Sequence, residues 1–309
     1  MYRKMLTEKL VKAILFACAA FAIIVVFFIF YYTLNQGKTD IAKLLLTGYA
    51  SFNSVNSHAA YYAAITTLYV AAVATLLAAA VGIPCAIYLA EFADMKFRNV
   101  TKTSIEVLDG FPSVVIGIVG WELLSNPQSS YSFTMFLSSI GMHGYSGCIL
   151  FMWLILVIMS FPVIATISED ALRAVPQDLR EASLGIGATK WQTTKEVLLP
   201  TATPRIVTSI LLALAASMGE TVAIYFVCGR TISPLITSPA SLILHPLVAS
   251  ETLTIILNNS YASTLEGGGP APSAFAEAFI LFVIIGAVII STRFFMAHRS
   301  GGSTERNSQ

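Results

Sequence analysis

Long apolar stretches separated by polar loops run along the whole chain. Six of them come close to the roughly 20 residues that a helix needs to cross the hydrocarbon core of a bilayer, and they cover residues 11–34, 61–90, 105–124, 147–168, 206–229 and 274–292. The third is the weakest, because three carboxylates and a proline interrupt it: Glu106, Asp109, Glu122 and Pro112. The pattern predicts an all-α membrane protein with six transmembrane helices.

The first stretch has the features of a membrane anchor. A signal peptide has an apolar core of only about 7–15 residues. This stretch is longer and ends in aromatic residues, which favour a membrane interface. We therefore expect residues 1–60 to hold an uncleaved transmembrane helix and a first external loop. Residues 297–309 are mostly small and polar, and we expect a disordered cytoplasmic tail there.

The composition agrees with a membrane protein and argues against other classes. Hydrophobic residues make up 56% of the chain and charged residues only 11%, against roughly 25% charged residues in soluble domains. With a net charge of +1, the chain lacks the basic footprint of a nucleic-acid-binding protein. Its cysteines are far apart and form no CxxC pair, so we expect no disulfide framework and no metal site.

The positive charges predict the orientation of the chain. All but three of the 18 Lys and Arg residues fall in the two tails and in the two loops that six spans would place on the same side. The exceptions are Lys38, Lys43 and Arg230. Because Lys and Arg accumulate in cytoplasmic loops, we expect a multi-pass protein of the cell membrane with both termini in the cytoplasm.

The cytoplasmic loop between the fourth and fifth spans, about residues 168–205, is too regular for a simple linker. Pro176 suits the first turn of a helix, where its missing N–H costs nothing. Leu179, Ala182 and Ile186 then form one apolar stripe. Gly187 can end this helix in a left-handed conformation.

A second short helix should follow in the same loop. Thr189 and Gln192 have the spacing of a capping box, and Pro200 and Pro204 should end the helix before the next span. The loop then forms a helix–turn–helix with small residues at its centre, which let another backbone approach. The pattern alone leaves open whether the loop contacts a partner protein or rests on membrane lipid.

The order of residues in this loop resembles the EAA signature of ABC importer permeases. That signature reads E-A-A-x3-G-x9-I-x-L-P, and the chain departs from it conservatively at Ser183 and Val197. The resemblance implies a type I ABC importer permease fold, in which this loop is a coupling helix that docks on a cytoplasmic ATPase subunit. The residues implied to couple to the ATPase are Glu181, Ala182, Ser183, Gly187, Leu199 and Pro200.

Further segments resemble the phosphate importer branch of this family. They are residues 168–176, 184–191, 88–92, 110–117 and 219–221. Of the two permease types in this branch, PstC and PstA, the chain is closer to PstC, chiefly through residues 167–170. The implied ABC permease core covers residues 61–296. The implied partners are an ABC ATPase dimer, an identical or paralogous second permease, and an external substrate-binding protein.

The sequence carries no sign of ATP hydrolysis by the chain itself. It lacks the GxxxxGK[ST] motif, and the glycine-rich run 185–190 has neither the spacing nor the preceding strand of a phosphate-binding loop. We therefore expect a transport subunit that is not an enzyme and has no cofactor of its own. ATP and Mg would be bound by the partner ATPase.

Glu220 is the notable charge inside a predicted span. A span that begins near residue 206 rises about 1.5 Å per residue, which places Glu220 roughly 20 Å from its inner end. A carboxylate at that depth usually faces a cavity or a partner, so a role in translocation and a structural hydrogen bond or ion pair both stay open. Together with Gly219 and Thr221, and with Pro112 and Ser113 in a segment expected to be unwound, Glu220 forms the candidate translocation pathway.

The resemblance implies inward transport of inorganic phosphate by alternating access that the ATPase drives. One departure weakens this substrate: the phosphate branch usually has an arginine where this chain has Ala216, and arginine is well suited to a tetrahedral oxyanion. Another oxyanion, such as molybdate or sulfate, is the alternative. A secondary transporter that uses Glu220 as its coupling carboxylate is a different class, which inverted repeats would favour, and we find none in the sequence.

Overall fold

The computed structural model describes residues 2–47, 59–129, 131–139, 147–228, 247, 250, 252–267 and 272–304. The elements in these segments are helices. Their bounds are α1 (Tyr2–Thr47), α2 (Ala59–Ile87), η1 (Tyr88–Phe92), α3 (Met95–Asp109), α4 (Ser113–Gly120), η2 (Trp121–Ser125), α5 (Phe133–Ser139), α6 (Ile149–Arg173), α7 (Gln177–Gly185), α8 (Lys190–Thr193), η3 (Thr194–Leu198), α9 (Leu199–Gly219), α10 (Val222–Val227), α12 (Leu253–Gly267) and α13 (Pro272–Thr304), where η marks a π-helical turn.

The described residues contain five helices that are long and apolar enough to cross a membrane. They are Glu8–Ile41, Ala63–Phe92, Ile149–Arg173, Lys190–Gly219 and Ala274–Ser291. A bent pair, Met95–Asp109 with Ser113–Ser125, raises the number to six if the two helices are counted as one span. The predicted all-α membrane class is confirmed. Arg230 and residues 305–309 lie outside the described residues, and α13 continues to Thr304, past the residue at which we expected the tail to begin.

The region of the expected third span is not one straight helix but two helices, α3 and α4 with η2, separated by a bend. Its two halves meet at an angle of 88°, and the break covers Gly110, Phe111 and Pro112, where the sequence predicted an unwound segment. Pro112 has no N–H to donate to the preceding turn, and it disfavours helical geometry at the residue before it. The sequence therefore predicted the location of this break but not its angle.

The expected fifth span differs from α9 at its start. Helical structure runs without interruption from α8 through η3 into α9, so the prediction that Pro200 and Pro204 end a helix is wrong. Pro200 lies in the first turn of α9 and Pro204 lies inside it. A proline kinks or weakens a helix without always ending it, and Pro200 lies in the first turn of α9, where a missing N–H costs least.

The chain divides into two units, and the first comprises residues 1–61 and 256–283. In this unit α1 lies very close to the start of α13. A Cβ atom on Gly37 would come within 2.6 Å of the Ala276 backbone nitrogen, so only glycine fits there. The rings of Phe30 and Phe279 pack beside this contact, with centroids 5.0 Å apart.

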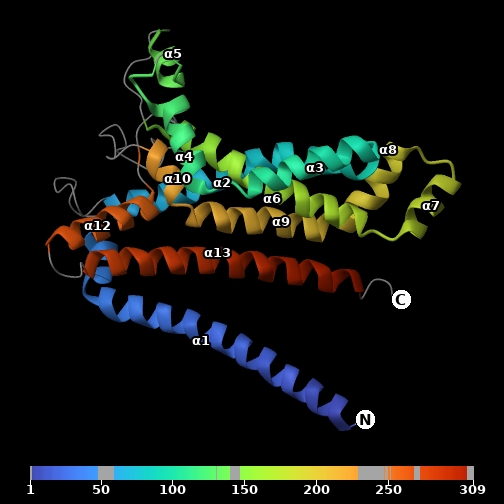
Figure 1. Ribbon diagram of the computed structural model, residues 1–309, viewed down its shortest axis with the longest axis horizontal. Helices are drawn as coiled ribbons and strands as arrows, with labels where there is room; N and C mark the ends of the chain where they lie inside the picture. Colours follow the sequence, from blue (N-terminus) through green and yellow to red (C-terminus); the bar gives the residue numbers. More distant parts are fainter. Residues whose placement is uncertain are drawn as a thin grey trace. The chain divides into compact units, whose positions relative to one another are not determined.

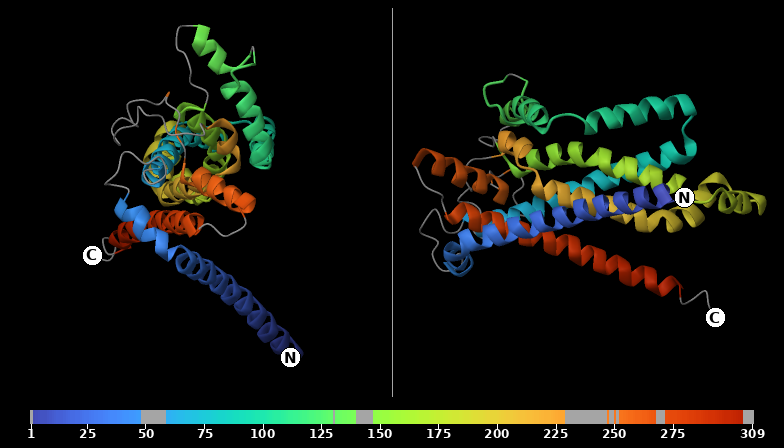
Figure 2. Two further views of the ribbon diagram at one scale, coloured as in Figure 1. Left: turned by 90° about the vertical axis from the view of Figure 1, so that its left-hand side faces the viewer. Right: turned by 60° about the horizontal axis from the view of Figure 1, so that its bottom comes forward.

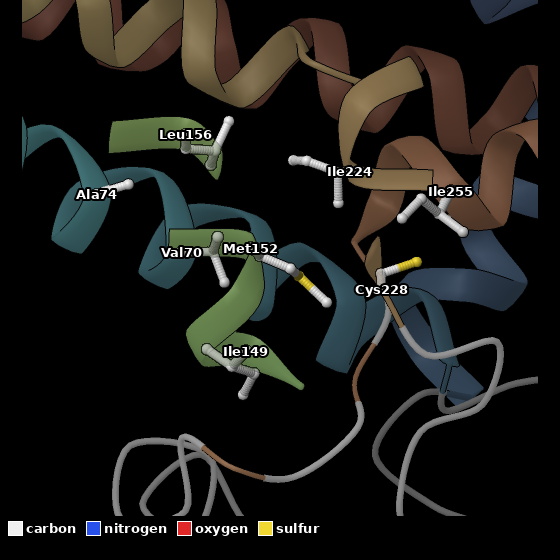
Figure 3. Packing of buried hydrophobic residues seen from close by; sticks show 8 residues of the cluster. All are labelled: Val70, Ala74, Ile149, Met152, Leu156, Ile224, Cys228 and Ile255. Atoms are coloured by element: carbon white, nitrogen blue, oxygen red, sulfur yellow. The ribbon is translucent and has the colours of Figure 1, made fainter. Parts of the chain in front are cut away.

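The second unit comprises residues 62–255 and 284–309, and α2, α6 and α9 share its core (Figures 1 and 2). A second apolar cluster joins α2 and α6 to α10 and the start of α12 (Figure 3) through Val70, Ala74, Ile149, Met152, Leu156, Ile224, Cys228 and Ile255. Figure 1 shows α7 and α8 at one end of this bundle and α4, α5 and α10 at the other. The two candidate sites therefore lie at opposite ends of the unit.

Candidate coupling segment and translocation pathway

The predicted helix–turn–helix forms between α6 and α9, and we call residues 177–198 the α7–α8 segment. Pro176 stands at the N-cap of α7 and not in its first turn. Gly187 has a φ of +91°, in the left-handed region that glycine adopts without steric cost. The capping box is also present, since the Gln192 N–H donates to the Thr189 hydroxyl and the Thr189 N–H donates to the Gln192 side-chain oxygen.

The outer face of the α7–α8 segment is apolar and uncovered. Ile186 is 88% exposed and Trp191 is 55% exposed. Leu179, Ala182 and Leu184 are also exposed on the segment, beside exposed polar and charged side chains that include Asp178, Glu181, Lys190 and Gln192. The predicted stripe of Leu179, Ala182 and Ile186 is therefore not buried in this chain. Large apolar side chains gathered at an exposed place mark a surface that contacts another molecule.

The six candidate coupling residues divide between this surface and the packed base of the segment. Glu181, Ala182, Gly187 and Pro200 are exposed. Ser183 is buried, and its hydroxyl forms a hydrogen bond with Thr193. Leu199 packs against the apolar cluster at the end of α6. Four of the six candidates thus lie in the α7–α8 segment, and Leu199 and Pro200 lie just after it, in the first turn of α9.

Sequence reasoning missed a buried carboxylate beneath the segment. Glu169, near the end of α6, is 1% exposed, and its carboxylate lies 2.6 Å from the guanidinium of Arg98 and 3.3 Å from the ammonium of Lys102. Lys102 also lies 3.0 Å from Asp170. A buried charge without such partners is strongly destabilising. These pairs therefore hold α3 against α6.

A further ion pair, between Arg180 of α7 and Glu91 of η1, was also missed. The two residues are 89 positions apart, so no local periodicity relates them. The only signal in the sequence was that both lie near segments that resemble the phosphate branch.

Glu220 lies at a second helix break, and not inside a continuous span as the sequence predicted. α9 ends at Gly219, and Glu220 has extended backbone angles (φ −68°, ψ 121°) before α10 begins. Its side-chain Oε1 accepts a hydrogen bond from the Ala223 N–H at 3.1 Å, so the carboxylate caps α10 from the residue before its N-cap, Thr221. Its carbonyl oxygen accepts a hydrogen bond from the Thr254 hydroxyl at 3.3 Å.

A gap too small to admit a water molecule lies beside this break. Its polar lining consists of Thr67, Ser217, Glu220, Thr252 and Thr254. Its apolar lining comes from α2, α6, α9 and α10. Of the candidate pathway residues in the described part of the chain, only Glu220 contributes to this lining.

The two helix breaks are connected through α4 and α10, the short helices that follow them. A Cβ atom on Gly117 of α4 would approach the Ala223 Cα of α10 to 2.9 Å. This distance is too short for any residue other than glycine. Gly120 lies one turn further along and faces Ile155 and Val227. Because Pro112 and Ser113 start α4 and Glu220 caps α10, the structure brings the two candidate segments into one packed pair of elements.

A helical bundle of apolar spans, with broken helices at one end and an exposed helix–turn–helix at the other, is the architecture of a membrane permease. Residues 82–299 match the family described as the inner membrane component of binding-protein-dependent transport systems, and the chain belongs to this family of ABC transporter permeases. It is therefore a multi-pass inner membrane protein.

Individual relatives agree with this family. The chain is 30% identical over 227 residues to the probable ABC transporter permease protein YqgI of Bacillus subtilis. The aligned region covers 73% of this chain and 72% of that protein. It is 31% identical over 228 residues to the phosphate transport system permease protein PstC of Mesorhizobium japonicum, covering 70% of this chain and 66% of that protein. The matches thus span about two thirds to three quarters of these relatives.

Solved structures show the same fold at low sequence identity. One is a bacterial ABC transporter involved in the import of the acidic polysaccharide alginate, with a TM-score of 0.63, 17% identity, and coverage of 95% of this chain and 98% of that one. Another is the MetNI methionine ABC transporter in an inward-facing conformation, with a TM-score of 0.56, 17% identity, and coverage of 79% and 95%. The expected type I importer permease fold is confirmed.

Proposed function

We propose that this permease is the membrane-spanning subunit of an importer for inorganic phosphate. The identity to PstC and the segments that resemble the phosphate branch support this substrate. A second permease, a pair of ATPases and an external substrate-binding protein complete the transporter. The ATPases bind ATP and Mg and supply the energy, and both termini of the permease face the cytoplasm.

The exposed apolar face of the α7–α8 segment is the observation that carries the proposal. Ile186 and Trp191 are exposed beside Glu181 and Ala182 of the EAA-like motif. Their burial against an ATPase subunit removes apolar surface from water, which favours association by about 25 cal/mol per Å². The turn at Gly187 presents this face at the tip of the bundle, where a soluble subunit can reach it (Figure 1).

The two helix breaks are the proposed translocation pathway. Gly219, Glu220 and Thr221 form one break, and Pro112 and Ser113 form the edge of the other. Helix breaks leave backbone groups without helical partners, and at membrane depth such groups are tolerated where they line a route or contact protein. The hydroxyls of Thr67, Thr252 and Thr254 add further polar groups beside Glu220.

A different oxyanion is the second candidate, and one observation favours it. Ala216, at the position where the phosphate branch usually has arginine, is exposed on α9. A basic group for phosphate must then come from the partner permease or from elsewhere in this chain. If neither supplies one, the route suits another substrate of the same class, such as molybdate or sulfate.

Uptake in cells tests the proposal directly. A strain that lacks this permease and other phosphate importers should regain ATP-dependent uptake of radiolabelled phosphate when the chain is returned together with its ATPase. Excess unlabelled phosphate should compete with the label, and sulfate and molybdate should not. Competition by molybdate or sulfate alone would reassign the substrate, and uptake that persists after ATP depletion would overturn the ATP-driven mechanism.

A further inference from the structure

Arg180 connects the α7–α8 segment to two transmembrane helices. One guanidinium nitrogen forms an ion pair with Glu91 of η1, the π-helical turn at the end of the second span. Another donates a hydrogen bond of 2.7 Å to the carbonyl oxygen of Leu172, in the last turn of α6. The side chains of Arg180 and Glu91 are 15% and 14% exposed, so the pair is largely shielded from water.

The chemistry of the guanidinium suits this position. Arginine presents several N–H donors in a rigid plane and can serve a carboxylate and a carbonyl together. The Leu172 carbonyl is among the last four of α6 and already accepts a hydrogen bond from the Val175 N–H at 3.3 Å, so Arg180 is a second donor to it. A cation near a helix C-terminus is also stabilised by the helix dipole. A lysine offers a single ammonium and cannot reproduce this geometry.

The neighbouring residue in the chain faces the other way. Glu181, the first residue of the EAA-like motif, is exposed, whereas Arg180 is turned toward α2 and α6. The Ser183–Thr193 hydrogen bond joins α7 to α8, and thereby to α9. Arg180 joins the same helix to η1, at the end of the second span, and to α6. Two side chains of one nine-residue helix, Arg180 and Ser183, therefore make three contacts that tie it to three spans.

We propose that Arg180 is a positioning residue that carries the movement of α7 into α2 and α6 when the ATPases close. This inference rests on the proposed docking of an ATPase on the α7–α8 segment. Glu91 receives the movement in a π-helical turn, a local departure from regular helix that often marks functional sites. Loss of the pair uncouples ATP hydrolysis from transport while the ATPase remains attached.

The test uses the complete transporter, with this permease, its partner permease and its ATPases, in liposomes with external binding protein. Arg180→Gln should retain its ATPases and hydrolyse ATP near the wild-type rate, while the phosphate taken up per ATP falls about tenfold. The matched control is Arg173→Gln, which removes the same charge from an exposed position at the end of α6. This control should keep the wild-type ratio.

A charge exchange separates transmission from simple stability. Glu91→Arg and Arg180→Glu should each lower the ratio, and their combination should recover part of it because the ion pair forms again in the opposite sense. An unchanged ratio in Arg180→Gln would overturn the proposal. It would also be overturned if uptake and hydrolysis fell in equal proportion, or if no variant, including the exchange, assembled with the ATPases.

A readout that does not depend on phosphate distinguishes failure of this inference from failure of the proposed substrate. Cys85 of α2 is half-buried, and with the other three cysteines replaced it can be labelled by a small membrane-permeant thiol reagent. ATP with vanadate should change its labelling rate in wild type and Arg173→Gln but not in Arg180→Gln. The same change in Arg180→Gln would overturn the inference, whether or not the transported ion is phosphate. A permease that retains no ATPase would overturn both proposals.

Discussion

The hydroxyl oxygens of Ser183 and Thr193 lie 3.0 Å apart and join α7 to α8. Both residues are buried, at 8% and 4% exposure. Ser183 stands where the EAA signature has its second alanine, which has no hydroxyl to make this bond. In this chain the departure from the signature therefore adds a contact that holds the two helices of the segment together.

Removal of this hydrogen bond should loosen the α7–α8 segment. Thr193→Val leaves the Ser183 hydroxyl buried without its partner and should lower the free energy of unfolding by about 1–3 kcal/mol. The double variant Ser183→Ala with Thr193→Val should lower it by less than the sum of the two single changes. Thermal unfolding of the purified permease in detergent measures this. Thr203→Val, at an exposed site where the hydroxyl bonds only its own helix, is the control, and an equal loss there would rule out a specific role for the pair.

Two neighbouring glycines separate backbone conformation from crowding. Gly187→Ala should destabilise the turn by about 1–2 kcal/mol, because a side chain at φ +91° is strained. A Cβ atom at either Gly187 or Gly185 meets nothing within 4 Å, so Gly185→Ala inside α7 should be neutral or slightly stabilising. Limited proteolysis of the segment and retention of the ATPase measure both effects. Equal behaviour of the two variants would show that the left-handed angle is not required.

A bulkier residue at Gly187 tests docking. Gly187→Trp should leave the protein inserted in the membrane and abolish transport, because the exposed face that it distorts is the proposed ATPase contact. Normal uptake by this variant would remove the α7–α8 segment from coupling.

Close packing of α4 on α10 should depend on Gly117. Gly117→Ala places a Cβ atom 2.9 Å from the backbone of Ala223, and such overpacking costs typically about 1–3 kcal/mol. The midpoint of thermal unfolding should fall. Gly110→Ala is the matched control, since its Cβ atom would lie 3.5 Å from the nearest atom, and a similar loss in the control would mean that the fall is not specific to the α4–α10 contact.

Two substitutions at Glu220 separate its cap from its charge. Glu220→Gln keeps an oxygen that can accept from the Ala223 N–H and should assemble normally, whereas Glu220→Ala removes the cap and should cost about 0.5–2 kcal/mol. If the negative charge acts in the pathway, the Gln variant should bind the loaded external protein yet transport poorly. Wild-type transport by a well-assembled Gln variant would leave Glu220 with the structural role alone.

The orientation can be tested with single cysteines. In a background without Cys18, Cys85, Cys148 and Cys228, Lys190→Cys should resist an impermeant thiol reagent on intact cells, and Lys43→Cys should react. This follows from the accumulation of Lys and Arg in cytoplasmic loops. Labelling at position 190 but not at 43 would reverse the proposed topology.

Local signals in the sequence sufficed for the features that short-range geometry controls. The apolar stretches identified the membrane class, because span length and hydropathy are properties of consecutive residues. The left-handed turn at Gly187 and the capping box of Thr189 and Gln192 were predicted for the same reason. The predicted end of a helix at Pro200 was wrong because proline can kink a helix without ending it, and α9 continues through Pro200 and Pro204.

Only the tertiary structure decided which distant residues meet. Arg180 and Glu91 are 89 positions apart. Position 117 has no room for a side chain only because the backbone of Ala223 packs against it. The sequence by itself determined that Glu220 is a costly charge within an apolar stretch, and the fold decided that this charge ends one helix and caps the next. The physical reason is that helix periodicity and turn chemistry act over a few residues, whereas ion pairs and close backbone contacts depend on how whole helices pack.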